Sequence, residues 1–327
     1  MNTAGVKTRL GIVGVGKMGE YHLRKLLALP HLETVGVFEA SPERAAAIRG
    51  AYGVTTFDSL ADLLFECDAV IIASPTELHA TQVRMALDQG VHVLVEKPMA
   101  STVAEAEALV ALAATKKLTL QVGMVERFRL ARLSDGMRIG HIRFLETHRL
   151  TSQLPRDKDI DVVSDLMIHD LDLALSLVDA DPGYVSAVGM KVLTPRHDMA
   201  NVRLEFGDGA VMNLNASRVS PEQVRRLRLF TETGYASFDF QLNTATWVTT
   251  ENGQPVRKQV AQSLQMDPLL DQAVHFAHCV KTGARPLVSG RDGLRALKHA
   301  ELVLARIQER EIQAHAGTQP HPSLEVR

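Results

Sequence analysis

The sequence predicts an α/β fold in which a doubly wound parallel sheet is followed by an α+β domain with an open, mainly antiparallel sheet. Over residues 9–122, short apolar runs alternate with amphipathic helical stretches, the pattern of βαβ units. After residue 123, apolar and polar residues alternate within the runs, as in strands with one solvated face. We therefore expect one domain over residues 1–122 and another over 123–327, with a loose tail from about residue 313.

The first part of the chain contains five strand-like segments separated by helix-like ones. The strand-like segments lie at residues 9–15, 33–38, 69–74, 91–96 and 118–123. The helix-like segments lie at residues 20–29, 41–52, 77–90 and 103–117. Because strands and helices alternate at this spacing, we expect the strands to form a parallel sheet.

The second part is expected to contain two hairpins and two helices. Residues 201–206 and 210–217 alternate strictly, and Gly-Asp-Gly at 207–209 separates them as a turn. Glu-Asn-Gly-Gln at 251–254 is a second hairpin signal. The two helix-like segments lie at residues 268–283 and 292–310.

Composition and charge indicate a cytoplasmic protein with neither nucleic-acid nor membrane partners. The 36 Lys and Arg residues are balanced by 38 Asp and Glu residues, so no strong positive field attracts polyanions. No apolar run reaches the roughly 18 residues of a membrane span, and the apolar run near the N-terminus is too short for a signal peptide. Two cysteines, Cys67 and Cys279, cannot form a disulfide framework.

A glycine-rich turn follows the first strand-like segment. In Gly-Val-Gly-Lys-Met-Gly, Gly14, Gly16 and Gly19 have the GxGxxG spacing between a strand and a helix. Gly14 allows the tight turn, Gly16 lets a pyrophosphate approach the backbone, and Gly19 lets helix and strand pack closely. A plain glycine turn is the alternative, but this context predicts a dinucleotide-binding Rossmann domain.

An acidic residue, Glu39, follows the second strand-like segment, 25 residues after Gly14. A carboxylate there can accept hydrogen bonds from both adenosine ribose hydroxyls and repels a 2′-phosphate, so the sequence favours NAD over NADP. Two alternatives stay open: Arg44 lies near enough in sequence to favour NADP, and Glu39 could be a solvated acid at a strand end.

Glu96-Lys97-Pro98 ends the fifth strand-like segment. Lys97 thus lies at the carboxyl end of a central parallel strand, where doubly wound sheets bind ligands. Proline restricts the loop that carries this lysine, and the sequence is compatible with either isomer of the Lys97–Pro98 bond. Thr-Val-Ala-Glu at 102–105 then forms a capping box that begins a helix. A surface lysine in a strand-end loop is the alternative role for Lys97.

The segment 165–178, Asp-Leu-Met-Ile-His-Asp-Leu-Asp-Leu-Ala-Leu-Ser-Leu-Val, is apolar on nearly every side, as a buried helix is. Within it, Asp165, His169 and Asp172 stand at i, i+4 and i+7, one stripe on one face. They are candidates for the wall of a catalytic site. The alternative is a buried Asp–His pair that satisfies only itself, with Asp172 capping or pairing with an arginine.

Five motifs in order resemble the Gfo/Idh/MocA oxidoreductases: GVGKMG, SPTELHA at 74–80, EKP at 96–98, QVGMVERF at 121–128 and SDLMIHDLD at 164–172. The resemblance continues into the late segment 276–301 and covers nearly the whole chain. It implies an NAD(P)-dependent oxidation or reduction of sugars, cyclitols and their derivatives. It also implies an open sheet that mediates assembly, here as a homodimer or homotetramer.

The resemblance assigns site residues one by one. The family's catalytic lysine matches Lys97, and its Asp-x-x-x-His pair matches Asp165 and His169. The cofactor contacts that it implies are Gly14, Gly16, Lys17, Met18, Gly19, Glu39, Ser74, Thr76, His79, Glu96 and Lys97. Neutral imidazole is available as a base near pH 7, Asp165 can hold the ring, and Lys97 can stabilise a developing alkoxide. This chemistry needs no metal.

Residues 126–133, 141–150 and 153–178 resemble a branch that oxidises the 3-hydroxyl of UDP-N-acetylglucosamine. In that branch a paired aminotransferase converts the ketone into a diamino sugar for lipid A. A diphosphate requires cationic partners, for which Arg127 and Arg156 are our first candidates. Two more arginines, Arg129 and Arg149, are further candidates, and each of the four could equally be an ordinary surface charge.

Two other functions fit the sequence. The first is a dehydrogenase of a free cyclitol or monosaccharide that uses the same Lys97, Asp165 and His169. The second, of another class, is a non-catalytic protein that senses the dinucleotide. It predicts NAD binding without NADH formation on any sugar, and the intact Lys–Asp–His set argues against it.

The Glu39 carboxylate should make the enzyme selective for NAD. Comparing the KM values for NAD and NADP checks this, with a lower KM expected for NAD because a 2′-phosphate is repelled. Equal use of both dinucleotides would contradict the assignment of Glu39 to the ribose.

Overall fold

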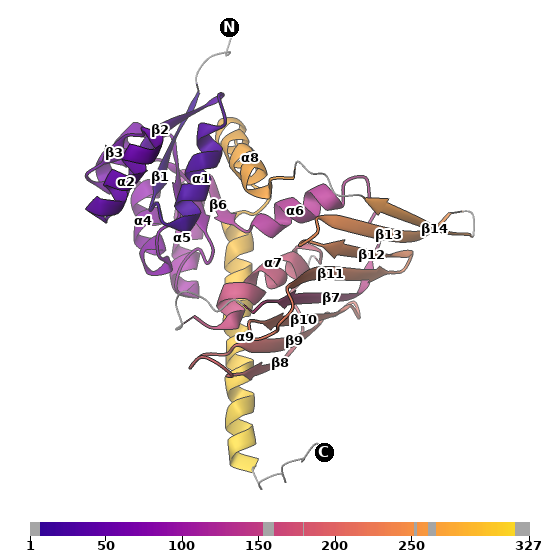
Figure 1. Cartoon of the computed structure of the whole chain (residues 1–327). Helices are drawn as coiled ribbons and strands as arrows, with labels where there is room; N and C mark the ends of the chain where they lie inside the picture. The colour runs from indigo at the N-terminus through magenta and orange to yellow at the C-terminus, as the bar shows by residue number, and fades with distance from the viewer. Residues whose placement is uncertain (1–6, 153–159, 179, 252–253, 261–265, 318–327) are drawn as a thin grey trace. The chain divides into compact units, whose positions relative to one another are not determined.

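The structure is a computed structural model that describes residues 7–152, 160–178, 180–251, 254–260 and 266–317 (Figure 1). The chain divides into two compact units. The first combines residues 1–135 with 262–297, and the second combines residues 136–261 with 298–327. The expected assignment of residues 1–122 to NAD binding and of 123–327 to substrate binding and oligomerisation stays a prediction.

The first unit contains a six-stranded parallel sheet in the order β3-β2-β1-β4-β5-β6. Its strands are β1 (Thr8–Val13), β2 (Leu32–Phe38), β3 (Thr56–Phe57), β4 (Ala69–Ile72), β5 (His92–Glu96) and β6 (Leu120–Gly123). This is the strand order of the Rossmann fold, so the predicted doubly wound parallel sheet is confirmed. The sequence predicted every strand of this six-stranded sheet except β3, which has only two residues.

The helices of the first unit are α1 (Lys17–Leu27), α2 (Pro42–Tyr52), α3 (Leu60–Glu66), α4 (Thr76–Asp88), α5 (Val103–Lys116), α6 (Val125–Leu133) and α8 (Pro268–Thr282). Four of them, α1, α2, α4 and α5, follow the expected alternation, and α3, α6 and α8 add to it. The predicted capping box begins α5: Thr102 Oγ1 accepts from the Glu105 amide at 3.2 Å, and the Glu105 carboxylate accepts from the Thr102 amide at 3.1 Å. These bonds satisfy amides that the helix itself leaves unpaired.

Helix α8 belongs to the first unit although it lies far along the chain. Its buried face contributes Ala273, Phe276 and Ala277 to the same apolar cluster as Leu10 of β1 and Leu23 of α1. It also lies against α6. Because these contacts bury apolar area, the core of the first unit depends on a helix from the late part of the sequence.

The second unit contains an eight-stranded sheet in the order β14-β13-β12-β11-β7-β10-β9-β8 (Figure 1). Its strands are β7 (Ile142–Leu150), β8 (Tyr184–Met190), β9 (Met199–Glu205), β10 (Val211–Ser217), β11 (Val224–Thr231), β12 (Gly234–Asp239), β13 (Thr244–Glu251) and β14 (Gln254–Val260). Neighbours pair antiparallel except β7 and β10, which are parallel. The mainly antiparallel sheet is therefore confirmed.

Both predicted hairpins are confirmed. Strands β9 and β10 pair with Val211 opposite Glu205, and Gly209 in the turn has a φ of +84°, which favours glycine. Strands β13 and β14 pair with Glu251 opposite Gln254.

Helix α9 (Gly290–Gly317) corrects one expectation. The loose tail was expected from about residue 313, but the helix continues to Gly317. Helical periodicity weakens after Arg310, so the sequence pattern ended before the helix does. The rest of the expected tail lies outside the described residues.

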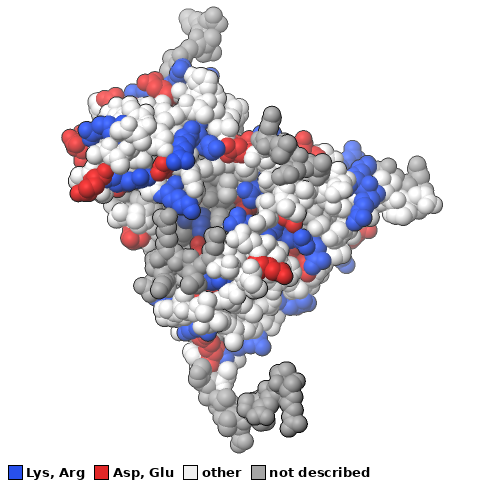
Figure 2. All heavy atoms as spheres, in the orientation of Figure 1, with Lys and Arg blue, Asp and Glu red and all other residues white. Residues whose placement is uncertain are grey.

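The described part of the chain holds no helix that combines the length and apolar character of a membrane span. On the face of the molecule that Figure 2 shows, Lys and Arg side chains are interspersed with Asp and Glu.

Candidate functional site

The glycine-rich turn is shaped by close backbone approaches. Gly14 has a φ of +79°, and a Cβ there would lie 2.8 Å from the backbone of Ser74, so the position requires glycine. A Cβ on Gly19 would lie 1.9 Å from the Gly14 carbonyl oxygen. A Cβ on Gly16 would meet no described atom within 4 Å. The turn is therefore tight on its protein side and open at the residue where a pyrophosphate would approach.

The first turn of α1 is available to an anion. Lys17 and Met18 are exposed beside Gly16, and no side chain of the described residues caps the helix start. Amides at a helix start favour negative charge, so the residues present fit the phosphates of a dinucleotide.

Glu39 lies directly after β2 and beside the glycine-rich turn. Its carboxylate accepts hydrogen bonds from the Val15 amide at 2.8 Å and from the Ser41 amide at 3.1 Å. The side chain is only half-buried. A half-buried carboxylate held in this way is suited to accept further hydrogen bonds from ribose hydroxyls, so the predicted ribose contact stays a prediction with favourable geometry.

Arg44, the sequence-based argument for NADP, is engaged elsewhere in the turn. Its guanidinium donates to the Val15 carbonyl at 2.8 Å and to the Glu20 carboxylate at 2.5 Å. Hydrogen bonds from Tyr52, Arg44 and Arg24 lower the pKa of Glu20 to about 2, so this carboxylate is charged at neutral pH. The ion pair with Glu20 gives Arg44 a role that needs no 2′-phosphate.

Lys97 lies in a tight turn directly after β5. The Lys97–Pro98 peptide bond is cis, and the lysine side chain is half-buried. The preceding residue, Glu96, places its carboxylate 2.7 Å from Nε2 of His22, which is completely buried on α1. Sequence reasoning missed His22, because its position on α1 carries no sign of a partner 74 residues away.

His79 lies between two backbone turns. Its ring is 1% exposed, with Nδ1 2.8 Å from the Pro98 carbonyl oxygen and Nε2 2.9 Å from that of Ser74. Ser74 donates from its hydroxyl to Gln82 at 2.6 Å, and Thr76 is the first residue of α4. Of the residues expected at the cofactor, the first unit thus brings the glycine-rich turn, Ser74, His79 and Glu96 into one connected set.

The second unit carries the predicted helix in two parts. One π-helical turn, η1 (Val163–Met167), contains Asp165, and the α-helix α7 (Ile168–Ser176) contains His169 near its start. Both side chains are half-buried, whereas Asp172 is 2% exposed. A π turn inside a helix often occurs at functional positions because it changes the direction of nearby side chains. The predicted helix is confirmed, and the roles of Asp165 and His169 stay predictions.

Asp170 of this helix forms a buried ion pair with an arginine. Arg149 at the end of β7 donates from Nε to Asp170 at 3.0 Å and from Nη2 at 2.9 Å. Both side chains are almost fully buried. The sequence suggested an arginine partner for Asp172 and passed over Asp170. Two parallel hydrogen bonds make Arg149 an anchor of α7, in place of the ordinary surface charge considered above.

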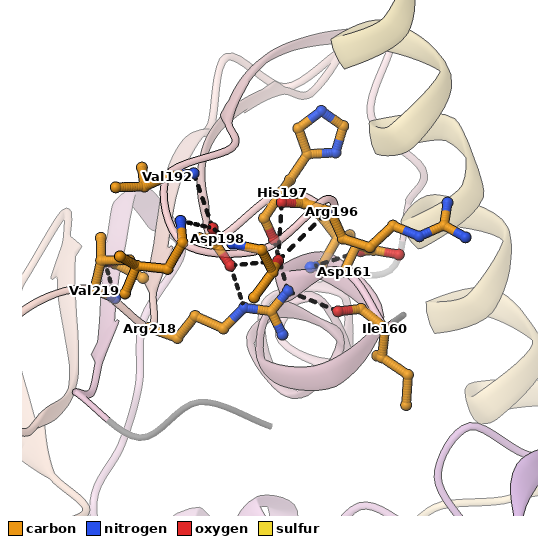
Figure 3. A network of polar contacts seen from close by, with 12 residues as sticks. Ile160, Asp161, Val192, Arg196, His197, Asp198, Arg218 and Val219 are labelled. Atoms are coloured by element: carbon orange, nitrogen blue, oxygen red, sulfur yellow. Dashed lines mark hydrogen bonds and ion pairs between the residues drawn. The ribbon is translucent and has the colours of Figure 1, made fainter. Parts of the chain in front are cut away.

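The start of η1 is held by a second buried pair, Arg218 and Asp198 (Figure 3). Arg218 Nε donates to Asp198 at 2.9 Å, and its Nη2 donates to the carbonyls of Ile160 at 2.6 Å and His197 at 3.0 Å. Asp161, the next residue, accepts from the Val163 amide at 2.8 Å. The guanidinium therefore ties the backbone just before the Asp165–His169 segment to the end of β10.

Asp198 receives several donors besides Arg218. Burial alone would raise its pKa, but backbone hydrogen bonds from Thr194, Leu193 and Val192 outweigh burial and lower the pKa below its usual value. The carboxylate is therefore charged when it meets the buried guanidinium. Sequence reasoning did not find this pair, whose members lie 20 residues apart, one directly before β9 and the other directly after β10.

The arginines expected at a diphosphate have different surroundings. Arg127 on α6 is 13% exposed and lies 3.7 Å from the Asp292 carboxylate. Arg129 donates to Glu126 at 3.1 Å. Arg156 lies outside the described residues. Arg127 thus stays a candidate, as does Arg156, and Arg129 has a local carboxylate partner.

Comparison with known proteins identifies both parts of the chain. A family described as "Oxidoreductase family, NAD-binding Rossmann fold" matches residues 8–124, and one described as "GFO/IDH/MocA C-terminal domain" matches residues 129–237.

Similarity to individual proteins extends over most of the chain. The chain is 37% identical to UDP-N-acetylglucosamine 3-dehydrogenase of Acidithiobacillus ferrooxidans, over 93% of its length and 98% of that protein. A solved structure of that enzyme covers 93% of this chain and 99% of its own with a TM-score of 0.87. The chain is also 25% identical to inositol 2-dehydrogenase of Rhizobium meliloti, over 92% and 97% of the two lengths.

Replacing Arg218 by methionine should lower the free energy of unfolding by about 3–5 kcal/mol, because it leaves the Asp198 carboxylate buried without its partner. Urea unfolding, monitored by circular dichroism, measures the change in the free energy of unfolding. Arg226→Gln is the matched control, since the exposed Arg226–Asp239 pair should contribute about 1 kcal/mol or less. Equal stability of the two variants would show that the buried pair is not an anchor.

Proposed function

Because the chain belongs to the Gfo/Idh/MocA family and is an NAD-dependent oxidoreductase, we propose that it oxidises the 3-hydroxyl of UDP-N-acetylglucosamine to the 3-keto sugar. The observation that carries this proposal is the 37% identity to an enzyme of that name over 93% of the chain. Similarity of this extent includes the second unit, where substrate recognition is expected, and not the dinucleotide fold alone.

We propose that Lys97 and His169 act on the same substrate hydroxyl. His169 as a neutral imidazole takes the hydroxyl proton, and Asp165 orients the ring and stabilises its protonated form. Lys97 donates a hydrogen bond to the oxygen and stabilises the negative charge that develops there. Bound NAD would supply the hydride acceptor for oxidation of the carbinol carbon. Asp165 in the π turn precedes His169 in α7 by four residues, and both side chains are half-buried.

The residues around the glycine-rich turn fit NAD. We propose that amides at the start of α1 contact the pyrophosphate and that Glu39 binds the adenosine ribose. Lys17, Met18, Ser74 and Thr76 complete the proposed cofactor contacts. Glu96 and Lys97 also stay proposed cofactor contacts. His79 is 1% exposed, so we propose that it contributes through the turns that it holds.

The substrate proposal includes a diphosphate, which arginines recognise by paired hydrogen bonds. Arg127 and Arg156 are the proposed contacts. A 3-keto sugar is a substrate for transamination, which supports pairing with a sugar aminotransferase in diamino-sugar lipid A synthesis. We also propose assembly as a homodimer or homotetramer through the eight-stranded sheet, which light scattering can test.

A free cyclitol is the second candidate substrate. It is favoured by the 25% identity to an inositol 2-dehydrogenase over 92% of the chain. Such a substrate offers a secondary hydroxyl to the same Lys97, Asp165 and His169 but no diphosphate.

Competition by UDP distinguishes the two substrates. NADH formation is measured with UDP-sugars, free amino sugars and inositols, each with and without UDP. If the enzyme recognises the diphosphate, UDP-N-acetylglucosamine supports turnover and UDP inhibits competitively. Turnover of inositol that UDP leaves unchanged would favour the cyclitol and contradict the nucleotide-sugar proposal.

Replacing Lys97 or His169 by alanine should each lower kcat by at least about 10²-fold, because each removes a group that acts on the hydroxyl in the transition state. The NADH dissociation constant, measured by fluorescence titration, should stay near the wild-type value. Turnover close to wild type in either variant would remove that residue from the proposed mechanism.

A further inference from the structure

Two buried histidines hold the turn that carries Lys97. His22 comes from α1 and is completely buried, and His79 comes from α4 and is 1% exposed. The first contacts the side chain of Glu96 and the second the carbonyl of Pro98, the two residues on either side of Lys97. Neither ring is open to a ligand, so neither acts on substrate directly.

The contact between His22 and Glu96 is short, and the Glu96 carboxylate has little room to move. Nε2 of His22 lies 2.7 Å from Oε1 of Glu96, whose side chain is 12% exposed. On its other side the carboxylate lies over the backbone of Gly123 in β6, where a Cβ would come within 2.7 Å of Oε2. The carboxylate is thus confined between an imidazole and a glycine. Because a buried carboxylate without a donor is costly, removing the imidazole should displace it.

His79 connects the lysine turn to the glycine-rich turn. Nδ1 lies 2.8 Å from the Pro98 carbonyl oxygen, and Nε2 lies 2.9 Å from that of Ser74. Carbonyl oxygens only accept, so a doubly protonated ring donates to both and a neutral ring donates to one. The backbone of Ser74 in turn lies where a Cβ on Gly14 would be 2.8 Å away. Close contacts thus run from Gly14 through Ser74 and His79 to Pro98.

The second connection starts from the same glycine-rich turn. Helix α1 begins in that turn. A Cβ on Gly19 would lie 1.9 Å from the Gly14 carbonyl oxygen, so the first turn of the helix is packed directly against the backbone of the glycine-rich turn. His22 follows Gly19 by three residues and lies on the same helix face. Both Glu96 and Pro98 are thus linked to the element that is expected to hold the dinucleotide phosphates.

We infer that His22 and His79 are positioning residues that hold Lys97 in register with the dinucleotide-binding turn. The inference rests on the proposed role of Lys97 in catalysis. The physical reason is that hydride transfer requires the alcohol and the nicotinamide in close alignment, and a displacement on the order of 1 Å can cost about 10²-fold in rate. The lysine side chain is flexible, so the accuracy of its position depends on the backbone of its turn.

The first test compares two replacements of His22. His22→Leu removes the donor to Glu96 at similar volume, whereas His22→Gln keeps an N–H donor. With NAD and UDP-N-acetylglucosamine, the leucine variant should lose roughly 10- to 100-fold in kcat with little change in the NADH dissociation constant. The glutamine variant should recover most of that loss. Equal kcat in both variants, at equal folded fraction by circular dichroism, would overturn the inference.

A readout without turnover accompanies the kinetics. Hydrogen exchange of the backbone amides of residues 96, 97 and 99–101, measured by mass spectrometry on the cofactor-free protein, should accelerate in His22→Leu and stay near wild type in His22→Gln. His92→Gln is the matched control, because His92 starts the same strand at its opposite end and accepts from the Thr119 amide at 2.9 Å. Unchanged exchange in His22→Leu would contradict a role in holding the turn.

A double-mutant cycle separates this inference from the proposed function. If His22 acts through Lys97, His22→Leu should lower kcat much less in a Lys97→Ala background than in the wild type. Equal losses in both backgrounds would overturn the inference. If Lys97→Ala alone keeps wild-type turnover, the proposed role of Lys97 fails, whatever His22 does to hydrogen exchange.

Gly123→Ala provides an independent approach if His22→Leu fails to fold. The added methyl group pushes the Glu96 carboxylate from the opposite side and leaves His22 intact. We expect faster exchange at residues 96–101 and a loss of kcat that shrinks in the Lys97→Ala background. Wild-type exchange and kcat in Gly123→Ala would show that the position of Glu96 does not matter to Lys97.

Discussion

The close approach of α1 to the glycine-rich turn is the constraint on which the first unit depends. Gly19 can lie against the Gly14 carbonyl only because it has no Cβ. This contact sets the start of α1 and therefore its rotation and height over the sheet. One turn later, the same face of the helix carries His22 to the carboxyl end of β5. A steric requirement at one residue thus decides which side chain meets Glu96.

Polar anchors have a similar part in the second unit. The helix formed by η1 and α7 is apolar on nearly all sides, and apolar packing alone has no direction. Arg218 holds the backbone before it and Arg149 holds Asp170 within it, each through more than one hydrogen bond. Charged pairs in a buried setting contribute little net stability but strongly oppose any arrangement that separates them. They orient a helix that would otherwise be free to rotate or slide.

Much of the fold followed from local patterns. The alternation of apolar runs and helical stretches predicted the parallel sheet, and Gly-Asp-Gly at 207–209 predicted the β9–β10 hairpin. The pattern missed what was short or weakly periodic: β3 with two residues, α3 with seven, and strands such as β11 and β12. The sequence pattern also grouped α8 with the second domain, whereas the structure places it in the first unit. The contacts of α8 with β1 and α1 join residues that lie far apart in the sequence, and a local pattern does not contain them.

The sequence by itself determined three features: the glycine-rich turn between a strand and a helix, the lysine at the end of a strand, and the Asp-x-x-x-His motif on a helical segment. These features depend only on neighbours in the chain, through steric freedom at glycine and the period of the helix. Only the tertiary structure decided that Glu96 meets His22, that His79 connects Ser74 with Pro98, and that Arg149 pairs with Asp170. Each of these contacts joins separate elements, and their side chains meet only after the backbone has brought those elements together.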